Sequence, residues 1–416
     1  MMKRRVAVVG IGTVNPAGNS VDESWPKIRD GITGIDRITS FDPEEVGVGV
    51  TLAGEVKDFD LTKRLDKREA RHEARFTQFA LYAAAEAMEM SGISYEDSEE
   101  DAGRAGVIIS CGIGGLDVIE EQHVRGMERG YDKVNPFFIP MTISNMAAAR
   151  IAIAYNLKGM CSCPVTACAG GTNAVGDAFH RIRDGYEDVM VCGGTESSIT
   201  KLAIAGFSNM KALCQATDKN RASIPFDAER SGFVMGEGAG ILVLEEMEHA
   251  KARGAKILAE IVGYGSNCDA YHITSPSPNG EGGAACMSLA IADAGIEPER
   301  IDYINAHGTS THLNDSGETN AIHQVFADYA SKVAVSSTKG VTGHLLGGAG
   351  GVEAVISVKT LMEQTIPPTA NYRVEDPECD LDYVPNQPRE TEVNYVLSNS
   401  LGFGGHNASV IFRKAE

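Results

Sequence analysis

The chain has 416 residues and a formal net charge of −20, from 37 Lys and Arg against 57 Asp and Glu. This excess of negative charge excludes a general affinity for nucleic acid or anionic membranes. The length predicts two or three compact units, at roughly 150 residues per domain. Nine cysteines are too few for a disulfide scaffold, and an odd number cannot all pair within one chain. We therefore expect a globular protein of a reducing compartment, in the cytoplasm.

Short apolar runs alternate with longer helical patterns, and this alternation predicts an α/β layered fold. The first run, VAVVGIG, contains glycines and has no cleavage site, so we interpret it as a strand and not a signal peptide. No stretch reaches the about 18 uncharged apolar residues of a membrane span. Strands are expected at 6–12, 105–110, 188–194, 238–246, 301–308, 332–338, 394–400 and 408–413. Helices are expected at 75–91, 146–157, 316–330 and 350–364, with another directly after Cys168.

A charged helical stretch at 245–260 weakly divides the chain, and the alternation of strands and helices resumes after it. We therefore expect two similar α/β halves, residues 1–255 and 256–416. The identity between the halves is too low to establish a sequence repeat.

Three cysteines lie within eight residues in CSCPVTACAGG, at 161–171. Cys168 precedes Gly-Gly and a segment whose apolar residues recur at helical spacing, so its thiol is expected at a helix N-terminus. Free backbone N–H groups and the helix dipole favour the reactive thiolate there. A metal site would need further ligands at suitable spacing, so Cys161 and Cys163 are expected to be small packed or interface residues. Cys168 is a candidate nucleophile, and the alternative is a buried small residue.

Two histidines occupy similar Gly- and Thr-containing segments, NAHGTST at 305–311 and KGVTGH at 339–344. Each lies where a predicted strand gives way to a loop, a common place for catalytic groups. A single histidine in a turn is more often bonded to backbone. Two such histidines beside a candidate cysteine favour a catalytic cluster of Cys168, His307 and His344.

Four separated segments carry a family resemblance: TACAGG, NAHGTST followed by Asn314-Asp315, SSTKGVTGHLLGGAGGVEA and SNSLGFGGHN. They resemble the signature segments of the elongating β-ketoacyl-acyl-carrier-protein synthases, type II rather than type I, in that family's order. The resemblance implies a thiolase-like fold, with two α/β halves in alternating helix and sheet layers, and a homodimer. It also implies a decarboxylative Claisen condensation in fatty-acid elongation. An acyl group held on Cys168 would react with malonyl-carrier protein to give 3-oxoacyl-carrier protein and CO2.

The resemblance assigns catalytic roles to six residues: Cys168, His307, His344, Lys339, Glu353 and Phe403. Cys168 would accept the acyl chain from a carrier thioester. The two histidines would act in decarboxylation and enolate stabilisation as neutral N–H donors, so no metal is expected. Lys339 would tune the electrostatics and Glu353 would support the loops. Phe403 would gate the acyl channel, and its N–H would join that of Cys168 in an oxyanion hole; the alternative for Phe403 is core packing.

The resemblance implies a second set of residues that bind substrate: Thr309, Thr311, Thr274, Ser275, Ile113 and Phe207. The four hydroxyl side chains would contact the phosphopantetheine arm. Ile113 would lie at the far end of the acyl pocket, where the alternative is another core isoleucine. Two residues depart from the family pattern. His312 stands where proline is common and would contact a cofactor phosphate or, as we favour, point to solvent; Cys111 is a candidate for the pocket wall.

The segment KRLDKREARHEAR at 63–75 carries six Lys and Arg against three Asp and Glu. Several arginines fall at helical spacing, and carrier proteins of this family are acidic, so this stripe is a docking candidate. The predicted docking residues are Arg64, Lys67, Arg68, Arg71 and, more weakly, Lys211. The alternative is a solvated helix face with internal ion pairs.

Two other functions remain open at this point. A polyketide-type ketosynthase would share every catalytic residue, and a non-catalytic partner subunit of the chain-length-factor kind typically lacks the cysteine that is present here. No bound cofactor is expected, because the phosphopantetheine arm arrives on the carrier protein. The expected partners are an acyl carrier protein and a second copy of the chain, without nucleic acid or membrane.

Overall fold

The computed structural model describes residues 3–66, 72–95 and 99–416. Its main sheet contains ten strands in the order β10-β9-β13-β14-β8-β1-β7-β6-β4-β5. The strands are β1 (Val6–Val14), β4 (Ala105–Ser110), β5 (Cys161–Ser162), β6 (Val189–Glu196), β7 (Gly238–Glu246), β8 (Ala259–Cys268), β9 (Tyr303–Asn305), β10 (Ala334–Ser336), β13 (Tyr395–Gly402) and β14 (His406–Lys414). Two small sheets pair β2 (Asp36–Arg37) with β3 (Leu52–Ala53), and β11 (Thr365–Ile366) with β12 (Arg389–Glu390).

The main sheet consists of two five-stranded halves with the same topology. Counted along the chain, the strands of each half lie in the order third, second, fourth, fifth, first. The first three of these positions pair in parallel and the remaining strands pair antiparallel, in both halves. Among the described strands, the two sheet halves are joined by a short antiparallel pairing of β1 with β8. The boundary expected at 255–256 falls between α9 and β8, and it stays a prediction.

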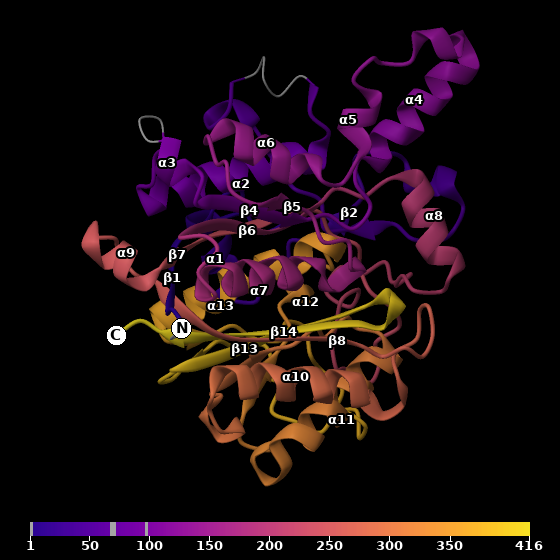
Figure 1. Cartoon of the computed structure of the whole chain (residues 1–416). Helices are drawn as coiled ribbons and strands as arrows, with labels where there is room; N and C mark the ends of the chain where they lie inside the picture. The colour runs from indigo at the N-terminus through magenta and orange to yellow at the C-terminus, as the bar shows by residue number, and fades with distance from the viewer. Residues whose placement is uncertain (1–2, 67–71, 96–98) are drawn as a thin grey trace.

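Helices form three layers around these two sheet halves (Figure 1). The α2 and α6 helices cover the outer face of the first half, α7 and α13 lie between the halves, and α10 and α11 cover the second half. The helices are α1 (Val21–Arg29), α2 (Arg75–Ser91), α3 (Glu99–Ala102), α4 (Leu116–Arg129), α5 (Phe138–Thr142), α6 (Met146–Ala154), α7 (Gly170–Arg183), α8 (Lys201–Asn209), α9 (Met247–Ala252), α10 (Glu281–Ala294), α11 (His312–Phe326), α12 (Lys339–Thr342) and α13 (Ala349–Glu363). This is the layered α/β fold expected of a thiolase-like chain.

Separate apolar clusters fill the spaces between these layers. The strands are apolar on both faces because helices cover both faces, as expected for buried sheets. Glycine allows the closest approach in the middle layer. A Cβ at Gly351 of α13 would lie 2.3 Å from the carbonyl oxygen of Gly240 in β7. Gly351 is therefore the point where α13 packs against β7, while Gly350 packs against Thr172 of α7 and Gly347 against Gly112.

The strands and most helices that were predicted are confirmed. The strand β8, the short strands β2, β3, β11 and β12, and the helices α1, α4, α8 and α10 were missed. The helix α11 begins at His312 and not at 316, the charged helical stretch at 245–260 contains the short helix α9 between the end of β7 and the start of β8, and the helix across 63–75 is wrong. Residues 61–63 form a 3₁₀ helix, residues 64–66 and 72–74 are not α-helical, and α2 begins only at Arg75. Lys67, Arg68 and Arg71 lie outside the described residues. Among the described residues, no helix has both the length and the apolar character needed to span a bilayer.

Candidate active site

One cavity of about 540 Å³ collects residues from both halves of the chain. The predicted site residues that line it are Cys168, His307, His344, Phe403, Thr309, Thr311, Thr274, Ser275, Ile113, Phe207 and Lys211. Lys339 and Glu353 lie just behind it, bonded to each other and to the loop of His307. Arg64 does not line the cavity. The two halves therefore meet at a single chemical centre.

Cys168 lies in a 3₁₀ turn, Ala167–Ala169, that leads directly into α7. The preceding Ala167 has φ +49°, an uncommon conformation for a residue with a Cβ. The end of β13 passes close by, since a Cβ at Gly402 would be 3.1 Å from the Cys168 nitrogen. This approach brings the Phe403 N–H to the cysteine sulfur. The turn thus holds the thiol at the N-terminus of α7, as predicted.

Opposing effects act on the pKa of the Cys168 thiol. Burial raises its pKa, while the positive charge of Lys339 and hydrogen bonds from the N–H groups of Phe403 and Cys168 lower it. Burial has the largest effect, so the thiolate expected from the helix terminus alone is not the resting form. Those same N–H groups suit an oxyanion on a bound thioester, where negative charge develops during reaction.

His307 and His344 stand with their rings nearly perpendicular, 84° apart in plane and 5.1 Å between centroids. Both are almost fully buried. Burial lowers the pKa of each imidazole well below its usual value, and the positive charge of Lys339 lowers it further. Both rings are therefore neutral near pH 7. A neutral imidazole donates an N–H bond without carrying a charge, which suits a developing enolate oxygen.

Lys339 fixes the loop that carries His307. Its Nζ donates to the His307 carbonyl oxygen at 2.5 Å and pairs with the Glu353 carboxylate. Both charged side chains are nearly inaccessible to solvent. Burial raises the pKa of Glu353, and the Lys339 ammonium opposes that shift. The pair joins α12 and α13 to the histidine loop and places a positive charge beside both imidazoles.

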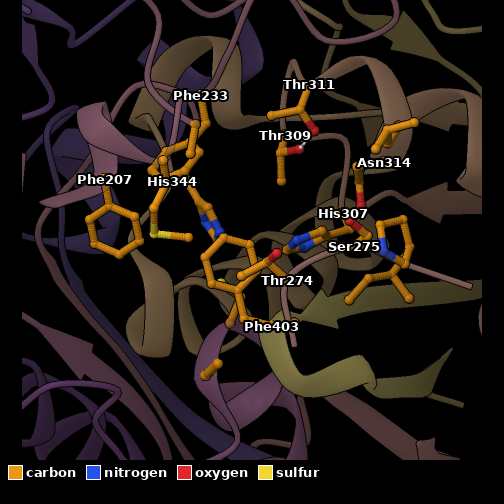
Figure 2. A pocket seen from close by; sticks show the side chains of 18 of the residues that line it. Phe207, Phe233, Thr274, Ser275, His307, Thr309, Thr311, Asn314, His344 and Phe403 are labelled. Atoms are coloured by element: carbon orange, nitrogen blue, oxygen red, sulfur yellow. Dashed lines mark hydrogen bonds between the residues drawn. The ribbon is translucent and has the colours of Figure 1, made fainter. Parts of the chain in front are cut away.

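Aromatic side chains form one side of the cavity and hydroxyl groups the other (Figure 2). Phe207 packs 5.6 Å from Phe233 and 6.3 Å from Phe403, measured between ring centroids. Phe403 is half-buried and is followed by Gly404 with φ +83°, a conformation that favours glycine. This geometry fits a movable aromatic side chain better than plain core packing. Ile113 also lines the cavity and belongs to the same apolar cluster as Cys168.

The hydroxyl side contains the predicted arm-contacting residues. The Thr309 and Thr311 hydroxyls lie 2.9 Å apart, and Thr274 and Ser275 line the cavity from the loop after β8. The His272 Nδ1 accepts the backbone N–H groups of Thr274 and Ser275, each at 3.2 Å. This side therefore offers hydroxyl groups for an amide-bearing chain.

The predicted docking stripe differs from expectation where it is described. Arg64 lies 3.3 Å from Glu89 and 3.7 Å from Glu86, so internal ion pairs hold it, as in the alternative given above. Lys211 is exposed, with φ +58°, and lines the cavity. Cys111 is fully buried beside Glu196 and does not line the cavity, although its neighbours Gly112 and Ile113 do.

Buried carboxylates that support the site were missed from the sequence. Glu318 on α11 accepts the N–H groups of His307 and Gly308, both at 2.8 Å. Glu196 at the end of β6 accepts N–H groups from Gly112 and Gly347, so it connects the Ile113 loop to the loop after His344. The sequence signal that could have identified Glu318 is the pair Asp315 and Glu318, two carboxylates at i, i+3 spacing shortly after HGTST.

Burial raises the pKa of Glu318 to about 7, although the N–H groups that it accepts lower it. Its carboxyl in the folded protein is thus protonated more readily than in the unfolded chain, and folding stability falls as pH rises from 4.5 to 7. Relative to Glu318→Gln, the wild-type free energy of unfolding should decrease by about 3 kcal/mol over that range. Urea unfolding of both proteins at several pH values measures this, and a difference independent of pH would contradict it.

The arrangement provides a buried nucleophile, two neutral N–H donors and backbone N–H groups around one apolar cavity. Such a site can hold an acyl group covalently and stabilise negative charge on a second bound molecule. The described residues contain no group of three or more His, Cys, Asp or Glu side chains placed to hold a metal ion.

Comparisons with known proteins agree with this geometry. Residues 3–250 match the model of the β-ketoacyl synthase N-terminal domain, and residues 258–373 match that of the C-terminal domain. A Synechocystis protein named 3-oxoacyl-[acyl-carrier-protein] synthase 2 is 50% identical over 413 residues, which cover 99% of this chain and 98% of that protein. A Staphylococcus aureus protein of the same name is 49% identical, with 99% of each chain covered.

A solved structure supports the same assignment. It is described as a type II PKS acyl-carrier protein in complex with its ketosynthase bound to the hexaketide, and it matches with a TM-score of 0.92. Its sequence is 35% identical, and the match covers 100% of both chains. Family models, full-length relatives and fold agree, and the chain therefore belongs to the β-ketoacyl synthase family.

Proposed function

We propose that this protein catalyses the decarboxylative condensation of an acyl group with malonyl-acyl-carrier protein in fatty-acid elongation. The observation that carries the proposal is the meeting of Cys168 with two buried, neutral histidines in one cavity. Both acyl groups arrive as thioesters on the phosphopantetheine arm of the carrier, so no resident cofactor is needed.

In the first half-reaction, the Cys168 sulfur attacks the thioester carbonyl of the acyl-carrier protein. The oxyanion accepts hydrogen bonds from the N–H groups of Cys168 and Phe403, which already point to the sulfur. Collapse of this intermediate breaks the bond to the carrier sulfur, which leaves as a thiol with the proton that Cys168 gives up, and the acyl group stays on Cys168. The exchange of one thioester for another is nearly neutral in energy, so it needs an activated sulfur and no external energy source.

In the second half-reaction, malonyl-carrier protein replaces the free carrier. The thioester oxygen of the malonyl group accepts N–H bonds from His307 and His344, and CO2 leaves as electrons move toward that oxygen. The resulting enolate carbon attacks the acyl carbon on Cys168, which forms 3-oxoacyl-carrier protein and releases the Cys168 thiolate; uptake of one proton from solvent restores the thiol. The positive charge of Lys339 favours the enolate, and burial together with that charge lowers the pKa of both imidazoles and keeps them neutral.

The direct test supplies the purified protein with an acyl-carrier protein and malonyl-carrier protein. We expect equimolar CO2 and a 3-oxoacyl-carrier protein two carbons longer than the starting acyl chain, detected by intact mass. Hydrolysis of the acyl thioester without chain extension would contradict the proposal.

Fatty-acid elongation is favoured over polyketide synthesis by the full-length relatives at 49% and 50% identity, which are named 3-oxoacyl-[acyl-carrier-protein] synthase 2. The polyketide ketosynthase structure is only 35% identical. The chain-length-factor alternative lacks support, because the nucleophile is present and the histidines surround the same cavity.

The cavity mouth supports an acyl carrier protein as partner. The arm must enter where the cavity opens, and the exposed apolar side chains Met210 and Leu313 line that opening together with Lys211. The ketosynthase in the solved complex described above also binds an acyl-carrier protein. An apolar rim with a positive charge suits a partner that is acidic around its arm.

Charge reversal at the cavity mouth tests this docking site. Lys211→Glu should raise KM for carrier-linked substrate by about threefold to tenfold, because it places a negative charge against an acidic partner. The effect should weaken at high salt. Steady-state kinetics at two ionic strengths measure it, with Lys332→Glu, an exposed lysine outside the cavity, as the control. Equal changes in both variants would argue against docking at Lys211.

A homodimer in the cytoplasm completes the proposal. Among the described residues, ten exposed large apolar side chains lie between residues 119 and 165, on and around α4, α5, α6 and the edge strand β5. Such a concentration indicates an interface, and an unpaired edge strand can pair with a second copy. Light scattering should give twice the 44.2 kDa mass of one chain. All nine cysteines are free, which fits a reducing compartment.

A further inference from the structure

The segment from His307 to His312 runs outward from the reaction centre to the mouth of the cavity. His307 is 1% exposed and Thr309 is 6% exposed, Thr311 is half-buried and His312 is exposed. All four line the cavity. A linear substrate arm with its thioester at Cys168 would therefore pass these residues in chain order. Whatever group ends the arm on the carrier side lies beside His312.

The backbone of His312 is firmly held while its ring remains available. The His312 carbonyl oxygen accepts from the Ser316 hydroxyl at 2.9 Å and from Arg230 Nη2 at 3.4 Å. Arg230 is itself buried and also donates to the Thr311 carbonyl oxygen. The imidazole of His312 makes no hydrogen bond to any described residue. The loop is thus fixed at the position where a side chain faces the opening.

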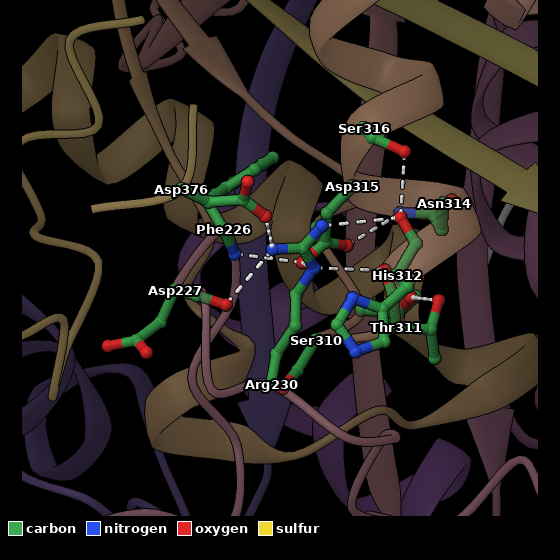
Figure 3. Close-up of polar contacts among 12 residues, drawn as sticks. Phe226, Asp227, Arg230, Ser310, Thr311, His312, Asn314, Asp315, Ser316 and Asp376 are labelled. Carbon is green, nitrogen blue, oxygen red and sulfur yellow. Dashed lines mark hydrogen bonds and ion pairs between the residues drawn. The ribbon is translucent and has the colours of Figure 1, made fainter. Parts of the chain in front are cut away.

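Two carboxylates near His312 are paired with the buried Arg230 (Figure 3), while a third carboxylate, Asp269, lines the cavity and accepts hydrogen bonds from the Ser277 N–H and the Asn407 side chain. Asp315 and Asp376 both face Arg230, with an ion pair to Asp376 and a 3.6 Å contact to Asp315. Burial raises the pKa of Asp376, while a backbone hydrogen bond, Arg230 and, less strongly, His312 lower it, and the net shift is downward. In a chain of net charge −20, this pairing keeps two carboxylates beside the mouth from repelling an anion.

Few cations line the cavity. His307 and His344 are neutral for the reasons given above, and Lys211 and His312 are the other basic side chains among the described residues that line the cavity. The segments that carry Lys211 and His312 both bond to the backbone of residues 232–233. The Gly232 N–H donates to the Ser310 carbonyl oxygen and the Phe233 N–H donates to the Ala212 carbonyl oxygen, each at 3.0 Å. An imidazole and a lysine at one cavity mouth can both donate N–H bonds to a phosphate group.

We propose that His312 binds the phosphodiester that joins the phosphopantetheine arm to its carrier, and that it makes the enzyme prefer phosphorylated arms. This inference rests on the proposed function and adds a specificity-determining residue to it. It revises the orientation toward solvent favoured from the sequence. His312 acts on binding of the arm and takes no part in the bond-making steps at Cys168.

The test compares two small thioesters with the same acyl chain, one of pantetheine and one of 4′-phosphopantetheine. The readout is the rate of Cys168 acylation, followed by intact mass, and the ratio of the two rates is the phosphate preference. Each variant is thereby normalised by its own rate with pantetheine. His312→Gln should lower the preference by about fivefold, the size of one partly exposed charged contact, while His312→Lys should retain it within about twofold.

His323→Gln is the matched control, because His323 lies on the same helix but faces Asp380 and does not line the cavity. It should show the wild-type preference. An unchanged preference in His312→Gln, or no preference in the wild type, would overturn the inference while leaving the proposed function intact. If neither thioester acylates Cys168, the proposed function fails and the inference fails with it.

Discussion

Replacing Cys168 with alanine should abolish formation of the acyl-enzyme and reduce condensation by on the order of 10⁴-fold or more, as expected when a covalent nucleophile is removed. No other thiol lines the cavity among the described residues. Cys168→Ala should therefore show no mass increase after incubation with acyl-carrier protein, whereas wild type gains one acyl group. Intact mass measures acylation, and product formation on the carrier measures condensation.

The neighbouring cysteines provide the control for this prediction. Cys161 is exposed and Cys163 is half-buried, and burial raises the pKa of both thiols. Cys161→Ala and Cys163→Ala should each keep wild-type acylation and condensation. Acylation that persists in Cys168→Ala but disappears in Cys161→Ala or Cys163→Ala would identify that other cysteine as the nucleophile and contradict the assignment. Circular dichroism spectra that match wild type exclude misfolding as the cause of any loss.

The sequence predicted the fold wherever strands are apolar without interruption. The β7 strand, for example, contains the uninterrupted apolar run ILVL at 241–244, because α2 and α13 cover its two faces. The β8 strand was missed because Glu260, Gly263 and Gly265 interrupt its apolar pattern. The structure explains these glycines: a Cβ at Gly265 would lie 2.3 Å from the Cys286 carbonyl oxygen of α10. Where a helix packs closely against a strand, glycines replace apolar side chains, and the strand no longer shows the apolar pattern that predicts it.

The helix expected across 63–75 failed for a different reason. Its arginines follow helical spacing, but Arg64 and Arg75 contact acidic partners on separate elements, Glu89 on α2 and Glu237 before β7. Charge periodicity on a solvated segment stabilises a helix only weakly. Arg64 and Arg75 are held by tertiary ion pairs, and the sequence alone does not show these contacts.

The site was predictable where chemistry needs rare residues in particular loops, as for Cys168, His307 and His344. The buried residues that hold the site in place were much harder to predict from the sequence. Arg230 and Glu318 lie in polar stretches that look like ordinary solvated surface, yet both are buried and bond the backbone of the segment from His307 to His312. Their function depends on which distant segment they meet, and local spacing carries no information about that.

Lys339→Met is expected to lower the free energy of unfolding by about 3–5 kcal/mol, the usual cost of removing one partner from a buried ion pair. It leaves the Glu353 carboxylate without a counter-charge in a site nearly closed to solvent. It also removes the anchor on the His307 carbonyl oxygen. Urea unfolding should show the loss of stability, and release of CO2 from malonyl-carrier protein should fall as well. This single variant does not separate the two effects, because a partly unfolded enzyme also loses activity.

The double variant Lys339→Met/Glu353→Leu separates them. Replacing both partners with apolar side chains removes the uncompensated charge, so most of the lost stability should return. Decarboxylation should stay low, because the cationic side chain beside both imidazoles and the bond to the His307 loop are still missing. Recovery of both stability and CO2 release would show that Lys339 is only a structural partner of Glu353. Recovery of stability alone would assign Lys339 a part in the reaction, through its charge or its bond to the His307 loop, as its contact with that loop leads us to expect.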